Sequence, residues 1–450
     1  MPPPAQPSPY LQNFLDGSAL RAVYQPLVSL RQQKIVGYEG LIRGTNHATG
    51  APVSPGELFA HAARERRTAD LDHSCRRKVL DSFREIHQAQ PDLVLSLNFD
   101  ASVLDQGTED PSPLRHLVQD AGINPSTVML EIIESDCHGV EALRRFIATH
   151  KAAGFLIALD DVGAGHSNLN RIPLLKPDII KIDRYLVQNL ANDFYKREVF
   201  KALVRMSRTI GALTISEGVE TREEAWASLE LGADLIQGYY FSVPLETQQL
   251  ETDNIFLNFK HPDSLNLERT GTNNWKARVD QLTADHKDST LENLRIKRSR
   301  LRRYDMLTRD IQAELGKCEQ EELDQNLKKL VHFYPLMECF YILNESGVQI
   351  TDRVFVNPKS VRDHGCLFHP SPKGSDHSMR DYYFMLFEAG LDRLTFVTEP
   401  YLSMASGTLC VTYARIFRNT KNHRFMLCTD INANSLDQLR AEAPLDSSLG

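Results

Sequence analysis

The chain has 450 residues, which is long for one domain and favours two. Hydrophobic residues make up 42 % of it, enough to build sizeable cores. Asp and Glu (59) outnumber Lys and Arg (51), and the resulting formal net charge of −8 argues against non-specific binding to long nucleic acid.

The first residues, MPPPAQPSPY, lack the basic start and apolar core of a signal peptide, and residues 1–19 are predicted to be a short unstructured lead. The sequence contains no apolar run of about 18 residues, so no membrane span or membrane partner is predicted. The seven cysteines are scattered without a CxxC pair, which is typical of reduced thiols in the cytoplasm.

Residues 20–250 alternate short β-branched runs with longer stretches of helical periodicity. Two such helical stretches cover residues 57–86 and 189–210. The strand candidates are AVYQPLVSL, KIVGYEGLIR, LVLSLNFD, TVMLEIIES, FLIALDDVG, PDIIKID, LTISEGVE and DLIQGYYF. This many strand–helix units predicts an α/β fold, a TIM-like (β/α)8 barrel whose active-site residues follow the strands.

Polar residues stand at the ends of these runs. Carboxylate and amide oxygens suit Mg²⁺ or Mn²⁺, and several carboxylates gathered at one barrel mouth would repel one another unless cations lay between them. Two divalent ions bridged by a carboxylate such as Asp160 would resolve that repulsion and form a two-metal hydrolytic site. The residues are Glu39, Asn98, Glu131, Asp160, Asp161, Lys181, Glu217 and Gln237.

Any one of these acids, taken alone, is more often a helix cap or a solvated loop residue. The joint pattern favours a site, because the adjacent Asp160 and Asp161 follow an apolar run and precede two glycines that allow a tight loop. Glu131 and Glu134 would point to opposite faces of an extended segment, which predicts different roles for them.

The charge content and the spacing of apolar residues change in the second half of the chain. Residues 251–330 are predicted to be a helical linker, because from about residue 275 the chain is dense in charge and its leucines and isoleucines recur at the spacing of one or two long helices. These helices could carry a signal or a dimer contact, or could simply pack on their own domain. Residues 331–440 predict a smaller α+β domain, with strands in FYILNESGVQITDRVF, GTLCVTYARIF and HRFMLCTDIN and a helix near 378–388.

The first half resembles the EAL family of cyclic di-GMP phosphodiesterases over residues 10–248. The motifs that carry the resemblance follow in the family's order: YEGLIRG, LNFD, LEIIES, DDVGAGHSNL, PDIIKID, SEGVET and QGYYFSVP. The resemblance implies metal-dependent hydrolysis of cyclic di-GMP to 5′-pGpG with two Mg²⁺ or Mn²⁺ ions per active site.

The resemblance also implies a role for each matching residue. Lys181 and Glu217 would act at the catalytic water together with Glu39, and Glu134 would anchor the aspartate loop. The implied metal ligands are Glu39, Asn98, Glu131, Asp160, Asp161 and Glu217. The implied substrate-binding residues are Gln25, Leu41, Arg43, Asp183, Gln237 and Pro244.

This chain departs from the family pattern at Gly40, where alanine is usual, and at Val162 and His166, where phenylalanine and tyrosine are common. Every expected ligand is present, so we expect an enzyme. Two alternatives stay open: a catalytically silent receptor for cyclic di-GMP, and a scaffold whose barrel only presents surfaces.

The C-terminal part resembles the Cache/PAS-like sensory fold more loosely, through RDYYFMLFEAG and TEPYLSMASGTLCVTYARIF. The resemblance implies a pocket for an unidentified small ligand lined by Arg380, Tyr382, Tyr383 and Asp430, although these aromatic residues could be core packing. Together the two halves predict a cytoplasmic, homodimeric regulator.

Overall fold

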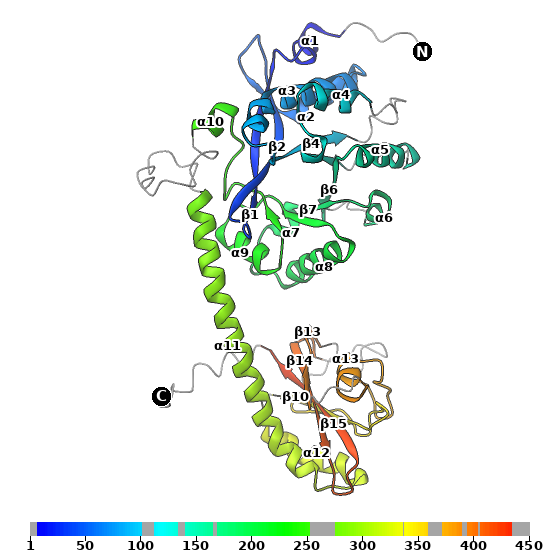
Figure 1. The fold of residues 1–450 in the computed structure, drawn as a ribbon. Helices are drawn as coiled ribbons and strands as arrows, with labels where there is room; N and C mark the ends of the chain where they lie inside the picture. The colour runs from blue at the N-terminus through cyan, green and yellow to red at the C-terminus, as the bar shows by residue number, and fades with distance from the viewer. Residues whose placement is uncertain are drawn as a thin grey trace. The chain divides into compact units, whose positions relative to one another are not determined.

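The computed structural model describes residues 7–100, 112–133, 140–164, 169–252, 275–335, 337–358, 371–388, 394–403 and 406–433. The chain divides into two compact units, Met1–Ser289 and Thr290–Gly450 (Figure 1). The boundary falls inside one long helix, α11 (Trp275–Leu315), so the predicted linker contributes residues to both units.

The first unit is a closed barrel of eight strands, as the sequence predicts. Their order is β1-β9-β8-β7-β6-β5-β4-β2, and pairing of β1 with β2 closes the ring. One feature departs from a regular (β/α)8 barrel, because β1 runs antiparallel to both of its neighbours. The strands are β1 (Leu20–Ser29), β2 (Lys34–Thr45), β4 (Val94–Asp100), β5 (Val128–Ile133), β6 (Leu156–Val162), β7 (Ile179–Ile182), β8 (Leu213–Ser216) and β9 (Leu235–Ile236), with β3 (Pro52–Val53) added at the edge of β2.

Helices surround the barrel. The predicted helix over 57–86 is two helices, because Arg66 adopts a left-handed backbone (φ 58°) between α2 (Pro55–Arg64) and α3 (Thr68–Ala89). Residues 9–15 of the expected lead form helix α1, capped by the Ser8 side chain. The others are α4 (Ser112–Asp120), α5 (Val140–Ala152), α6 (Arg171–Leu175), α7 (Arg184–Val187), α8 (Phe194–Ile210), α9 (Arg222–Glu230) and α10 (Thr247–Thr252).

A small apolar layer fills the barrel interior beneath the strand ends. Its buried members are Leu27, Met129, Ala158, Ile179 and Ile215. Each stands two residues from a polar residue of the predicted site, on the same strand or directly after its end, so both side chains point to the same face. The period of two that places the apolar layer inside therefore also points the polar side chains into the barrel mouth.

The second unit is built on an antiparallel sheet in the order β11-β10-β15-β14-β12, with β13 (Tyr401–Leu402) paired to β14. Its other strands are β10 (Met337–Leu343), β11 (Val354–Phe355), β12 (Thr395–Val397), β14 (Leu409–Arg418) and β15 (Arg424–Asn432). One face packs on α11 and α12 (Leu323–Leu330) through a cluster that includes Ile311, Leu327 and Phe340. The other face packs on α13 (Asp381–Tyr383) and the following π-helical turn η7 (Phe384–Glu388).

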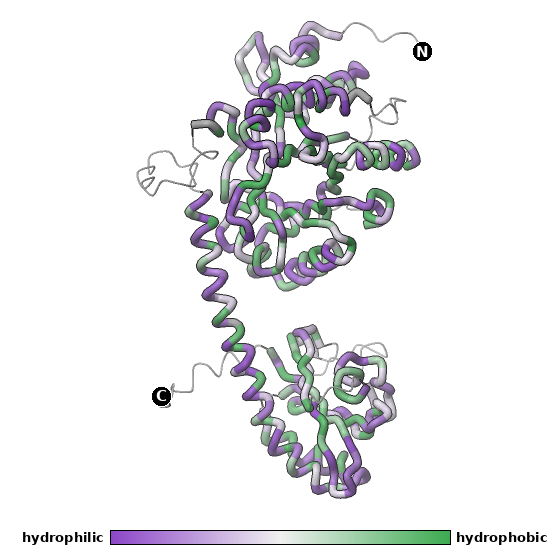
Figure 2. The backbone as a smooth tube through the Cα atoms, viewed as in Figure 1, coloured by the Kyte–Doolittle hydropathy of each residue, from purple (hydrophilic) through white to green (hydrophobic). Residues whose placement is uncertain are grey.

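In the described parts of the chain, no helix is both long enough and apolar enough to cross a membrane. The longest, α11, is rich in charged residues and is largely purple in Figure 2.

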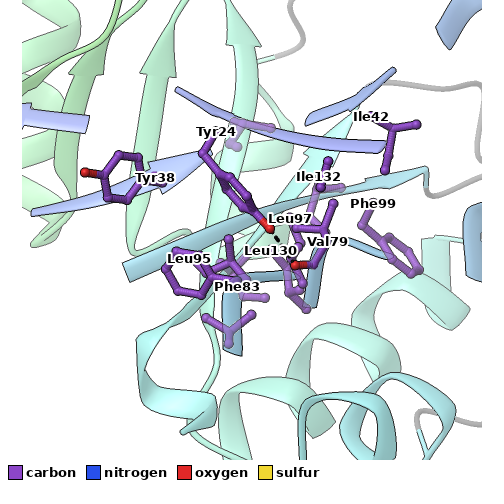
Figure 3. Packing of buried hydrophobic residues seen from close by; sticks show 14 of the residues in the cluster. Tyr24, Tyr38, Ile42, Val79, Phe83, Leu95, Leu97, Phe99, Leu130 and Ile132 are labelled. Carbon is purple, nitrogen blue, oxygen red and sulfur yellow. Dashed lines mark hydrogen bonds between the residues drawn. The ribbon is translucent and has the colours of Figure 1, made fainter. Parts of the chain in front are cut away.

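The contact between β2 and α3 explains why position 40 holds glycine, where the resemblance described above leads us to expect alanine. Gly40 pairs with Tyr24 across the β1–β2 ladder, and the Tyr24 hydroxyl donates a hydrogen bond of 2.7 Å to the Val79 carbonyl on α3 (Figure 3). A Cβ atom at Gly40 would lie 2.2 Å from the Val79 Cγ1 atom. Val79 occupies the space that an alanine would need.

We therefore expect Gly40→Ala to lower the free energy of unfolding by about 1–3 kcal/mol through overpacking. Adding Val79→Ala should relieve the clash, so that the double variant is more stable than the sum of the single changes by about 1–2 kcal/mol. Urea unfolding of the four proteins of this cycle measures the coupling, and strictly additive effects would show that the contact does not limit this position.

Candidate active site at the barrel mouth

Lys181 is the centre of the polar cluster. Its side chain is only 2 % exposed, and its Nζ atom lies 2.5 Å from Glu217 Oε1 and 2.7 Å from Glu131 Oε2. Two further carboxylates approach it, Asp160 at 3.3 Å and Glu39 at 3.8 Å. Four different strands or strand ends thus place carboxylates around one ammonium group, which a fifth strand carries.

Amide side chains hold Glu39 from both sides. Asn98 Nδ2 donates to Glu39 Oε1 at 2.9 Å, and Gln237 Nε2 donates to Glu39 Oε2 at 2.6 Å. Gln237 also contacts Gln25 Oε1 at 3.2 Å, and Gln25 donates in turn to the Ser242 carbonyl. The network fixes the orientation of the Glu39 carboxylate between β1, β2, β4 and the segment after β9.

A backbone irregularity brings the two adjacent aspartates together. In a regular strand Asp160 and Asp161 would point to opposite faces, but Asp161 adopts a left-handed backbone (φ 55°) where the β6–β7 register shifts. The Asp161 amide donates to Asp160 Oδ1 at 3.0 Å. Asp160, Asp161 and Glu217 can each offer a carboxylate oxygen, and these oxygens lie within 4.8 Å of one another.

Charge is poorly balanced in this cluster, because four carboxylates surround one lysine and a fifth, Asp161, lies beside Asp160 and Glu217. Burial, reinforced by neighbouring carboxylates, raises the pKa of Glu131 to about 8 and that of Glu217 well above its usual range despite the Lys181 ammonium. Burial also opposes ionisation of Glu39, but Lys181 and the hydrogen bonds from Gln237 and Asn98 outweigh it and hold the Glu39 pKa below its usual value. The four carboxylates around Lys181 raise its pKa against the effect of burial.

Divalent cations fit this arrangement. The available donors are hard carboxylate and amide oxygens, which Mg²⁺ and Mn²⁺ prefer. A cation beside Asp160, Asp161 and Glu217 would supply the positive charge that Lys181 alone cannot provide.

The remaining predicted residues that the structure describes come from β2, the segment after β9 and the start of α7. Leu41 and Arg43 follow Glu39 on β2 at intervals of two, and both are half-buried. The half-buried Pro244 follows β9, two residues after the buried Ser242. Asp183 caps helix α7, accepting a hydrogen bond of 2.8 Å from the Tyr185 amide. Glu134 lies outside the described residues.

Sequence reasoning missed Ser96. This fully buried serine lies on β4 two residues before Asn98, and its hydroxyl donates to Glu131 Oε1. Lys181 takes the other oxygen of the same carboxylate. The signal that could have found Ser96 was its position, a small polar residue two places before Asn98 and therefore on the same face of β4.

In the second unit, Arg380 is exposed and stands at the start of α13, whereas Tyr382, Tyr383 and Asp430 are buried. The Tyr382 hydroxyl contacts His377 Nδ1 at 2.8 Å, and the Tyr383 hydroxyl donates to the Glu345 carbonyl at 3.0 Å. The arginine that approaches Asp430 is Arg353, with Nη1 3.6 Å from Asp430 Oδ2. Arg353 was not among the predicted pocket residues.

The model of the EAL domain matches residues 10–244, which is more than half of the chain. The chain belongs to the EAL domain family. It is also 28 % identical over 401 residues to YkuI of Bacillus subtilis, an EAL-domain protein, and this alignment covers 87 % of the chain and 90 % of YkuI.

The crystal structure of YkuI, in complex with its substrate cyclic di-GMP and calcium, matches with a TM-score of 0.72 and 25 % identity. The match covers 94 % of this chain and 98 % of YkuI, so the likeness extends across both units. A probable cyclic di-GMP phosphodiesterase, PdeB of Escherichia coli, is 30 % identical over 236 residues, covering 52 % of this chain but only 44 % of PdeB.

Replacing Lys181 tests how far the stability of the protein depends on its buried ammonium group. Lys181→Met should lower the free energy of unfolding in EDTA by about 3–5 kcal/mol, because it leaves buried carboxylates without their counter-ion. Added Mn²⁺ should recover a larger share of stability in the variant than it adds to the wild type. Lys151→Met, which removes a half-exposed ion pair with Asp178, should cost less than about 1 kcal/mol; similar losses in the two variants would argue against a special role for Lys181.

Ser96 offers a test that does not depend on catalysis. Ser96→Ala removes the hydrogen bond that orients Glu131, and the Mn²⁺ concentration giving half-maximal thermal stabilisation should rise by about tenfold. Ser207→Ala, which removes an equally buried hydroxyl on α8 that donates to the Leu203 carbonyl, should leave that concentration unchanged. An unchanged Mn²⁺ dependence in Ser96→Ala would mean that Glu131 does not need this serine to bind metal.

Proposed function

We propose that the barrel hydrolyses one phosphodiester bond of cyclic di-GMP to give 5′-pGpG, with two Mg²⁺ or Mn²⁺ ions. The observation that carries the proposal is the convergence of Glu39, Glu131, Asp160 and Glu217 on Lys181, with Asp161 turned toward the same place by its left-handed backbone. The complex of YkuI with cyclic di-GMP and calcium supports the choice of ligand.

Different side chains of the cluster are proposed to have different roles in the reaction. Asn98 and Gln237 hold Glu39, so one carboxylate is fixed before any ligand arrives. Lys181 lies between the proposed metal ligands and can donate a hydrogen bond to a water molecule or a phosphate oxygen in their midst, while Glu217 can accept a proton there. Bound divalent ions would supply Lewis acidity and lower the pKa of a water molecule.

Substrate contacts are proposed for residues around this centre. Arg43 is half-buried on β2, on the same side of the strand as Glu39, and its guanidinium suits a phosphate group. The other proposed contacts come from Gln25, Leu41, Asp183, Gln237 and Pro244. Glu134 is proposed to anchor the loop that follows β6.

The second unit is proposed to be a Cache/PAS-like sensory domain that regulates the barrel through α11, in a homodimer located in the cytoplasm. An antiparallel sheet with a long helix on one face and short helical turns on the other supports this interpretation. The residues proposed for its ligand pocket are Tyr382, Tyr383 and Asp430, with Arg380 at the rim.

Incubating the purified full-length protein with cyclic di-GMP in EDTA, Mg²⁺ or Mn²⁺ tests the enzymatic proposal. We expect 5′-pGpG to accumulate only with metal, as measured by chromatography. Glu39→Ala should reduce turnover by about 100-fold or more because it removes a metal ligand, whereas Glu230→Ala, which changes an exposed pair with Arg197, should be as active as the wild type. Tight binding of cyclic di-GMP without any product would instead identify a receptor.

A further inference from the structure

Two backbone segments at the barrel mouth carry Glu217 and Gln237, and hydrogen bonds join them. The Gln237 amide donates to the Ser216 carbonyl at 2.9 Å, and the Val219 amide donates to the Gln237 carbonyl at 3.1 Å. The Tyr240 amide donates in turn to the Val219 carbonyl at 2.9 Å. The two segments therefore hold each other in place, so a displacement of either one would shift both functional side chains.

Close packing leaves these joined segments, residues 216–219 and 237–240, little space in which to move. A Cβ atom at Gly238 would lie 2.1 Å from the Val219 carbonyl oxygen, so only glycine allows the two backbones to approach this closely. The Val219 side chain is fully buried in the barrel core. A contact that fixes one point of the joined segments therefore helps to fix all of them.

The first part of α11, up to Ser289, belongs to the first unit and packs on the barrel. Its residues Val279 and Leu282 are fully buried in the hydrophobic core of that unit. Farther along the helix, Asp285 forms an ion pair with Arg222 at the start of α9, the helix that follows the first joined segment. Apolar burial and this ion pair together define where the helix lies on the barrel.

Arg278 connects this part of α11 to the joined segments. Its half-buried side chain places the guanidinium carbon 5.0 Å from the centre of the Tyr240 ring, which is the geometry of a cation–π contact. The Tyr240 ring also packs against the barrel core and meets the ring of the fully buried Phe241 edge-on. Tyr240 is thus held between α11 and the core, while its backbone amide holds Val219.

We propose that Arg278 is a positioning residue for the reaction at the barrel mouth. It acts through Tyr240 on the joined segments, and so on the carboxylate of Glu217 and on the Gln237 amide that orients Glu39. The proposal rests on the function proposed above and deepens it, because it names a contact through which α11, a helix that continues into the second unit, sets the activity of the barrel. A misplacement of about 1 Å far from the reacting atoms can cost about 100-fold in rate, so partial loosening of this contact is measurable.

Kinetics of Arg278→Met in the full-length protein test the proposal. At saturating Mn²⁺, kcat for cyclic di-GMP should fall by about tenfold while KM changes by less than about threefold, because the alignment of the groups changes but their number does not. The Mn²⁺ concentration giving half-maximal thermal stabilisation should rise by about threefold or more, since Glu217 is less well placed. Arg278→Lys keeps a cation over the ring and should bring both values back to within about twofold of the wild type.

Lys276→Met is the matched control on the same helix. It removes a hydrogen bond of 3.2 Å to the Gln33 carbonyl, in the turn between β1 and β2, and should leave kcat and the Mn²⁺ dependence unchanged. Tyr240→Leu should reproduce the losses of Arg278→Met, and combining the two should lower kcat by less than about a further twofold. Wild-type behaviour of Arg278→Met, an equal loss in Lys276→Met, no recovery in Arg278→Lys, or multiplicative losses in the double variant would each overturn the proposal.

The Mn²⁺ titration distinguishes failure of this proposal from failure of the proposed function. A wild type that binds Mn²⁺ but forms no 5′-pGpG would contradict the enzymatic function, and the Mn²⁺ requirement of Arg278→Met would then decide the positioning role, supporting it if raised and overturning it if unchanged. An active wild type that Arg278→Met matches would contradict the positioning role alone. A wild type that neither binds Mn²⁺ nor hydrolyses cyclic di-GMP would overturn both.

Discussion

The barrel mouth depends on one constraint, the placement of a buried lysine among several carboxylates. Lys181 contacts four acidic side chains from different parts of the barrel, and each contact requires its strand to end at the correct height. A single ammonium cannot neutralise them all, and burial amplifies the repulsion that remains. The mouth is thus organised by Lys181 but left with an excess of negative charge, which is a favourable setting for divalent cations.

Much of this could be predicted from the sequence because the two relevant signals are local. Alternation of apolar and polar residues along each run gives the strand and the side that faces inward, so Ile179 and Lys181, or Ile215 and Glu217, reveal both the apolar layer and the site above it. The order of the runs then indicates a barrel. The antiparallel direction of β1 could not be predicted in this way, because alternation has the same appearance in both directions.

The parts that escaped prediction depend on non-local geometry. Ser96 stands two residues before Asn98, but its role appears only when β5 places Glu131 beside it. Arg353 is far from Asp430 in the chain and approaches it only in the folded sheet, so the sequence gives no reason to pair the two. Likewise, the break between α2 and α3 depends on the backbone of Arg66, which helical periodicity does not register.

Buried charged groups have different partners in the two units. In the barrel, carboxylates outnumber the lysine and amide groups orient Glu39, so the cluster lacks positive charge. In the second unit, neutral hydroxyl and thiol groups donate hydrogen bonds to the Asp430 carboxylate, and the buried Arg353 Nε atom has no hydrogen-bond partner among the described residues. Because a buried charge is costly unless it has hydrogen bonds or partners of opposite charge, the barrel mouth favours bound cations, whereas the sheet of the second unit already satisfies Asp430.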